Sequence, residues 1–214
     1  MGAGITFDTM LYDLLRPLAW LLTHLVCRYR VSGREHIPLS GSLLVVANHL
    51  SWYDPIILAL VLRRRVWFFA KQEVFRWPVV GWLCRLTGQI PVHRGEGDRA
   101  ALEKALVYLR AGKALLFFPE GTVERQEQML AAHTGMAMLA VRTGATILPV
   151  GHTGTRRILR SWFPPVTIHI GEPLVPVVPA GVAHKTALQM ITQDVMLRIA
   201  GMLPPERRGV YYQV

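Results

Sequence analysis

A histidine and an aspartate lie close together directly after a short apolar run. His49 and Asp54 are five positions apart within the stretch NHLSWYD. Across a tight strand-to-helix turn, the Asp54 carboxylate can accept the Nδ1 proton of the imidazole, fix its tautomer and leave Nε2 free as a base. A general base of this kind accelerates a reaction by roughly 10²–10⁴-fold. The pair predicts removal of a proton from a substrate group. The structural alternative is a core histidine beside an aspartate that only begins a helix.

A second polar group follows another apolar run. The segment FPEGT covers residues 118–122, where Pro119 and Gly121 predict a sharp turn. Such a turn brings backbone N–H groups and the Glu120 carboxylate to the edge of a sheet, where the carboxyl ends of strands hold ligands in α/β proteins. An ordinary turn with a solvated glutamate explains this segment equally well when it is taken alone.

Both groups need a sheet to position them. The expected strands are residues 43–47, 66–70, 89–92, 114–118, 146–150 and 166–170. The expected helices are residues 55–62, 79–86, 98–111, 134–142 and 184–202, with Asp54 as the N-cap of the first. This alternation predicts an α/β fold in which a mixed central sheet is flanked by helices, within a domain covering residues 36–214.

The N-terminal segment has a different character. Residues 11–27, LYDLLRPLAWLLTHLVC, are largely apolar. They are interrupted by Asp13, Arg16, Pro17 and His24. Because a membrane-spanning helix needs about 20 mostly apolar residues, we expect one or two short helices in the membrane interface, and residues 1–35 as a hydrophobic helical membrane-binding segment. The alternative is a helix packed on the core of its own domain.

Composition limits the possible partners. The chain has 214 residues, of which 51% are hydrophobic and 18% charged, with 24 basic and 14 acidic side chains. Such a composition excludes a disordered chain. Twenty of the basic residues are arginine, which favours an anionic partner such as lipid phosphate. The basic residues are scattered and no nucleic-acid-binding motif is present, so no nucleic-acid partner is expected. The two cysteines form no CxxC pair, so we expect no metal site and a cytosol-facing location.

Four motifs in order resemble those of the glycerophospholipid acyltransferase superfamily, which includes bacterial 1-acyl-sn-glycerol-3-phosphate acyltransferases. NHLSWYD is similar to the NHxxxxD motif of that family, and GQIPVHR at residues 88–94 is similar to its second motif. FPEGT resembles the third motif, and ILPV at residues 147–150 resembles the fourth. The resemblance covers roughly residues 15–175, and the apolar N-terminal segment resembles the membrane-binding helices of such enzymes.

This resemblance implies roles for individual residues. His49 and Asp54 fall on the catalytic pair, and Arg94 falls on an arginine assigned to the acceptor phosphate. The substrate-binding residues implied by the motifs and their surroundings are Lys71, Arg94, Glu120, Gly121 and Thr122. One position departs from the family pattern, since FPEGT is often followed by arginine and here by Val123.

The resemblance also implies a reaction. A fatty acyl group passes from acyl-CoA or acyl carrier protein to the sn-2 hydroxyl of 1-acylglycerol-3-phosphate, giving phosphatidic acid, with the thioester as co-substrate and no cofactor. No GxSxG motif is present, so the substrate hydroxyl itself is expected to attack. We expect this at the cytoplasmic face of the cell membrane, on a peripheral or monotopic protein. Two alternatives remain: another lysolipid or alcohol acceptor, and a non-enzymatic scaffold that binds lipid or nucleic acid.

Overall fold

The computed structural model describes residues 7–62, 64–93, 98–123, 127–158 and 160–212. The helices are α1 (Phe7–Val26), α2 (Asp54–Val61), α3 (Pro78–Leu86), α4 (Arg99–Arg110), α5 (Gly135–Thr143) and α6 (His184–Gly201). The strands are β1 (Arg28–Ser32), β2 (Leu43–Ala47), β3 (Val66–Lys71), β4 (Ile90–Val92), β5 (Ala114–Phe117), β6 (Thr146–Thr153) and β7 (Pro165–Ile170). Short 3-10 helices are η1 (Arg34–His36), η2 (Gln72–Arg76), η3 (Thr155–Arg157), η4 (Pro205–Arg207) and η5 (Gly209–Tyr211).

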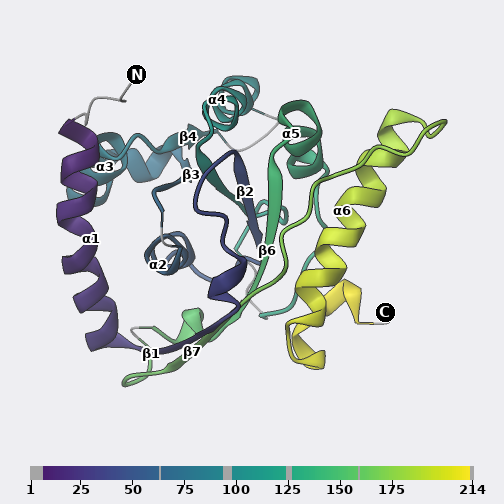
Figure 1. Cartoon of the computed structure of the whole chain (residues 1–214). Coiled ribbons are helices and arrows are strands. Elements are labelled where there is room, and N and C mark those ends of the chain that lie inside the picture. The colour runs from purple at the N-terminus through teal and green to yellow at the C-terminus, as the bar shows by residue number, and fades with distance from the viewer. Residues whose placement is uncertain (1–6, 63, 94–97, 124–126, 159, 213–214) are drawn as a thin grey trace.

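Within the described ranges, the strands form one sheet in the order β1-β7-β6-β2-β5-β3-β4. Every neighbouring pair is parallel except β6 and β7, which are antiparallel. The α/β fold with a mixed central sheet flanked by helices, predicted from the sequence, is therefore confirmed (Figure 1).

Two hydrophobic cores lie on opposite faces of the sheet. All residues of β2 are buried, and alternate side chains point to opposite faces. Leu44 and Val46 pack in the core that α4, α5 and α6 cover. Leu43 and Val45 pack in the core that α2 covers. Burial on both faces explains why the sequence of β2 is continuously apolar, as is typical of a central parallel strand.

Strand β1 is a feature that the sequence did not predict. Residues Arg28–Ser32 pair in parallel with β7, so the sheet begins before the domain boundary expected at residue 36. The strand lies at the edge of the sheet and its residues alternate between exposed and half-buried. Because its outward positions carry arginine, the segment looks like a basic cluster rather than a strand.

The N-terminal segment forms a single helix of 20 residues, which is longer than the one or two short helices that were expected. Helix α1 contains Pro17 and contacts α2 and β1. The Arg16 guanidinium donates a hydrogen bond to the Leu62 carbonyl at 3.2 Å, which ties the helix to the domain. Leu18, Leu22 and Leu25 nevertheless remain exposed. None of the helices in the described ranges is long and apolar enough to cross a membrane.

Candidate active site

The sheet brings the predicted motifs to one edge. Strands β2, β3, β5 and β6 run parallel to one another, so their carboxyl ends point the same way. His49 follows the end of β2, Glu120 follows the end of β5, and Lys71 ends β3. The shared strand direction therefore gathers residues that are far apart in the sequence.

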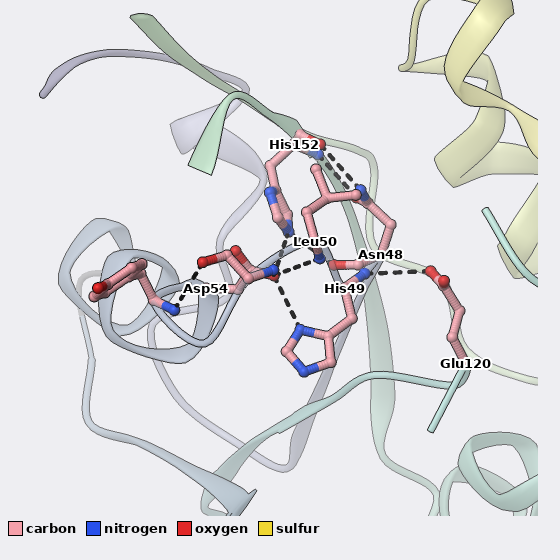
Figure 2. A network of polar contacts seen from close by, with 8 residues as sticks. Asn48, His49, Leu50, Asp54, Glu120 and His152 are labelled. Atoms are coloured by element: carbon pink, nitrogen blue, oxygen red, sulfur yellow. Dashed lines mark hydrogen bonds and ion pairs between the residues drawn. The ribbon is translucent and has the colours of Figure 1, made fainter. Parts of the chain in front are cut away.

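The predicted contact between His49 and Asp54 is present. The imidazole Nδ1 lies 2.9 Å from Asp54 Oδ2 (Figure 2). The same oxygen accepts hydrogen bonds from the backbone N–H groups of Leu50 and Ser51, at 2.7 and 2.8 Å. The expected N-cap role of Asp54 is wrong, because Asp54 is the first residue of α2 and its side chain turns back to the preceding turn. This orientation places the fully buried carboxylate on the imidazole rather than on the helix.

The surroundings of Asp54 favour its ionised form. Burial opposes ionisation and by itself raises the pKa of the carboxyl group, but attraction to His152 and the hydrogen bond and attraction from His49 outweigh it, so the pKa of Asp54 is lowered. An ionised carboxylate can only accept hydrogen bonds, so His49 carries its proton on Nδ1. The Nε2 lone pair of His49 is then available as a base.

Glu120 supports the backbone of the same turn. Its carboxylate is buried, with Oε1 accepting from the His49 N–H and Oε2 from the Leu130 N–H, both at 3.2 Å. Gly121 follows with φ of 66°, a conformation that glycine adopts without strain. The ring of Phe118 stacks on the imidazole of His49 with centroids 4.1 Å apart. The solvated glutamate of an ordinary turn is therefore wrong, whereas the substrate-binding role of Glu120 stays a prediction.

A second histidine, which sequence reasoning did not select, lies behind the pair. Strand β6 runs three residues beyond its predicted end and carries His152, whose side chain is fully buried. Its Nε2 lies 2.7 Å from the Asn48 carbonyl oxygen, to which it donates, and 3.7 Å from Asp54 Oδ2 (Figure 2). The only signal in the sequence is the position of His152 just after a buried strand.

Asn48 joins the ends of the two strands. The backbone pairing of β2 with β6 ends at Ala47 and Val150. Beyond it, the Asn48 side-chain amide donates to the His152 carbonyl and accepts from the His152 N–H, both at 3.0 Å. The amide thus continues the ladder after β2 leaves the sheet, and it holds the turn that contains His49.

A cavity of about 500 Å³ opens beside this network. Its walls come from the turn at residues 50–53 and from Lys71, Thr122, Val123, Arg156, Ile158 and Arg160. Two predicted substrate-binding residues, Lys71 and Thr122, therefore line one cavity. Arg94 lies outside the described residues, and its contact with the acceptor phosphate stays a prediction. Among the described residues, no group of three His, Cys, Asp or Glu side chains is arranged to hold a metal ion.

The chain matches known proteins along most of this site. Residues 28–153 match the acyltransferase family model. A lyso-ornithine lipid O-acyltransferase from Pseudomonas aeruginosa is 36% identical over 135 residues, which cover 62% of this chain and 50% of that protein. A 1-acyl-sn-glycerol-3-phosphate acyltransferase from Borreliella burgdorferi is 29% identical over 175 residues, covering 78% of this chain and 70% of that protein.

A solved structure is also similar. The crystal structure of the 1-acyl-sn-glycerophosphate acyltransferase from Thermotoga maritima superposes with a TM-score of 0.70 at 29% identity, covering 88% of this chain and 77% of that one. The present chain spans about half the length of the lyso-ornithine lipid acyltransferases that it matches.

Proposed function

Because this chain belongs to the acyltransferase family, we propose that it transfers a fatty acyl group from a thioester to the free hydroxyl of a lysolipid. The observation that carries the proposal is the hydrogen bond of 2.9 Å between His49 Nδ1 and an Asp54 carboxylate that two backbone N–H groups hold in place. This geometry prepares Nε2 to take a proton from an alcohol. The alcohol oxygen is itself the nucleophile, so no side chain of the protein needs to act as one.

The reaction then follows in two steps. The acceptor oxygen attacks the thioester carbonyl while its proton passes to His49 Nε2, and Asp54 stabilises the imidazolium that forms. The tetrahedral intermediate collapses with cleavage of the carbon–sulfur bond, and the imidazolium returns its proton to the leaving thiolate. Coenzyme A and acyl carrier protein both supply such a thiol, so either serves as the donor in this proposal.

Lysophosphatidate is the acceptor that the motifs predict, and the charge of the cavity supports it. The described walls carry Lys71, Arg156 and Arg160 and no acidic side chain. A phosphate monoester, with a charge of about −1.5 to −2 at pH 7, suits such a site. The product with this acceptor, acylated at the sn-2 hydroxyl, is phosphatidic acid.

Lyso-ornithine lipid is the second candidate acceptor, and the comparisons favour it. Four relatives named for this lipid are 30–38% identical, against 29% for the Borreliella lysophosphatidate enzyme. Val123 stands where the resemblance leads us to expect arginine, which removes one cation from the wall. An ornithine headgroup carries a carboxylate and an ammonium group, and so needs less positive charge than a phosphate.

The exposed apolar side chains support action at a membrane surface. They include Leu21, Leu25, Trp77, Val79 and Trp82 on α1 and around α3. Trp52 lines the cavity, and its ring lies 6.4 Å from that of Trp77, so this apolar surface reaches the cavity. A lysolipid held in the bilayer then presents its hydroxyl to His49 without leaving the membrane. The cytoplasmic face remains the prediction from cysteine usage.

The direct test is an acyl-transfer assay with purified protein. Lysophosphatidate and lyso-ornithine lipid are offered separately in vesicles, each with acyl-CoA and with acyl-carrier-protein thioester, and the products are identified by mass spectrometry. We expect transfer to lysophosphatidate at a higher kcat/KM than to lyso-ornithine lipid. The reverse order would make lyso-ornithine lipid the acceptor. Absence of transfer in all four combinations, from protein that retains its folded secondary structure, would refute the proposed reaction.

A further inference from the structure

The segment that follows β6 contributes two arginines to the cavity beside His49. Arg156 lies in η3, and Arg160 follows it after one further turn of chain. Both line the cavity, together with Lys71 from the end of β3. Three cations, one from β3 and two from the segment after β6, thus share one cavity, in which none of the described wall residues is acidic. An anion in this cavity is attracted to all three cations.

The backbone holds this arginine segment in a defined position. Gly154, just before η3, has φ of 87°, and a Cβ atom there would lie 2.1 Å from the Pro165 carbonyl oxygen. Only glycine therefore allows this close approach. Thr155 is fully buried, so the chain is anchored immediately before Arg156. A cation carried by an anchored turn loses less entropy on binding an anion than one on a loose loop.

The segment after β5 lacks a cation at the position where the family motif often provides one. Val123 follows Thr122 in the cavity wall and presents an apolar side chain. Among the described wall residues, positive charge for an anion therefore comes from Lys71 and from the segment after β6. Arginine suits this task because its planar fork can donate two parallel hydrogen bonds to a carboxylate or phosphate.

We propose that Arg156 and Arg160 form an anion-binding subsite for the acceptor headgroup and supply the charge that Val123 does not. The ligand is a phosphate or carboxylate attached to the lysolipid whose hydroxyl reaches His49, so the inference rests on the proposed function. The same segment continues from His152, which contacts the turn of the catalytic pair. Binding of the headgroup anion and positioning of the base therefore depend on one stretch of β6 and its following turn.

Arg157 provides a matched control. It lies in the same 3-10 helix, it is exposed, and it does not line the cavity. Arg156→Ala, Arg160→Ala and Arg157→Ala each remove one positive charge from the same surface region. All three variants therefore lose the same attraction between charge and membrane. Only Arg156→Ala and Arg160→Ala also lose a contact with the headgroup.

The test compares acceptor kinetics in vesicles of neutral lipid. The acceptor is whichever of lysophosphatidate and lyso-ornithine lipid is the better substrate. We expect Arg156→Ala and Arg160→Ala each to raise its KM about tenfold, the loss typical of a hydrogen bond to a charged group. We expect kcat to change little, Arg156→Lys to restore part of the loss, and Arg157→Ala to leave KM unchanged. Equal KM values in all three alanine variants would overturn the subsite. So would an equal rise in KM for 1-monoacylglycerol, an acceptor without an anionic group.

A binding measurement separates the subsite from the reaction. Titration calorimetry with sn-glycerol 3-phosphate should show binding to the wild type and to Arg157→Ala, and none to the double variant R156A/R160A. If this pattern holds but no acceptor is acylated, the subsite stands and the proposed function fails. If inorganic phosphate binds as tightly as sn-glycerol 3-phosphate and does not compete with the lysolipid, the cavity is a site for free phosphate and the headgroup assignment is overturned.

Discussion

The buried network around Asp54 and the neighbouring cavity differ in the burial of their side chains and in how those side chains are held. In the network, Asp54 and His152 are fully buried, and the donors to Asp54 Oδ2 from His49, Leu50 and Ser51 lie within 2.9 Å. In the cavity, charge comes from long side chains on several elements, with Arg160 exposed and Lys71 half-buried. Loss of one partner in the network leaves a buried polar group unsatisfied, whereas a lost cation is partly replaced by water and by its neighbours.

This difference implies that the chemistry and the choice of acceptor are set in separate regions. Substitutions in the network should lower kcat, because they disturb the base that acts in the transition state. Substitutions in the cavity should raise the acceptor KM, because headgroup binding is shared by the ground state and the transition state. A network variant that mainly raises the acceptor KM, or a cavity variant that mainly lowers kcat, would contradict this separation.

Removal of the base should have the largest effect. We expect His49→Ala to lower kcat by about 10³-fold, within the range for general-base catalysis, and to leave the acceptor KM within about twofold. Without the imidazole, Asp54 Oδ2 keeps its hydrogen bonds from the Leu50 and Ser51 N–H groups, so the turn should stay folded. Single-turnover acyl transfer measures the rate, and thermal unfolding checks the fold. Turnover near the wild-type rate would remove His49 from the mechanism.

Asp54→Asn should come next, with a loss of about 10²-fold or more in kcat from a misassigned histidine tautomer. It should also change stability with pH. The pKa of Asp54 is below its ordinary value of 3.8 in the folded protein, because contacts with His152 and His49 outweigh its burial. The stability from ionised Asp54 is therefore fully present above about pH 5 and is lost as pH falls through the folded pKa.

Denaturant unfolding of wild type and Asp54→Asn checks this dependence. The difference in unfolding free energy should shrink as the pH falls from about 5 into stronger acid. A difference that grows as the pH falls would contradict a lowered pKa for Asp54.

A substitution of His152 tests whether the network extends beyond the pair. His152→Leu leaves the buried Asn48 carbonyl without its donor, and should cost about 1–3 kcal/mol of stability and about tenfold in kcat. His152→Gln should retain most of the stability and most of the kcat, since the glutamine amide can donate to the same carbonyl. Urea unfolding and steady-state kinetics measure the two effects. If the leucine variant loses stability but keeps full kcat, the role of His152 is structural.

A substitution of Lys71 tests whether a cation of the cavity affects acceptor binding rather than the chemical step. Its ammonium group lies 4.6 Å from the centroid of the Trp52 ring, which holds it at the cavity wall. Lys71→Met keeps the chain length but removes the charge, and should raise the KM of lysophosphatidate about fivefold with little change in kcat. Acceptor titrations at saturating donor measure the split. A fall in kcat larger than the rise in KM would place Lys71 with the catalytic network instead.

The smallest effect should come from the aromatic tip of the β6–β7 loop. Trp162 is 99% exposed, and Phe163 beside it has φ of 49°. The following residue, Pro164, accepts a hydrogen bond from Arg28 directly after α1, so this tip adjoins the proposed membrane-binding helix. We expect Trp162→Ala to weaken binding to anionic vesicles about two- to threefold, measured by flotation.

Tyr212→Ala is the control for this prediction. Tyr212 is also an exposed aromatic residue, but the C-terminal end of the chain lies on the side of the molecule opposite α1 (Figure 1). Equal losses in the two variants would mean that Trp162 is not part of a membrane-facing surface.

Local sequence determined much of the fold and part of the site. The six predicted strands exist because each is a short apolar run, and the central strands β2, β5 and β6 are the ones buried on both faces of the sheet. The contact of His49 with Asp54 was also predictable, since five residues in a strand-to-helix turn restrict where both side chains can lie. Strand β1 was missed because edge strands carry polar residues that obscure their pattern.

Only the tertiary structure decided which distant residues share the site. His152 meets Asn48 because β6 lies beside β2 and continues past its end to pair with β7. Arg156 and Arg160 line the same cavity as Lys71 because the parallel strands direct their carboxyl ends to one edge. Spacing along the chain carries information about contacts within a turn, whereas contacts between strands depend on their order in the sheet, which no local pattern specifies.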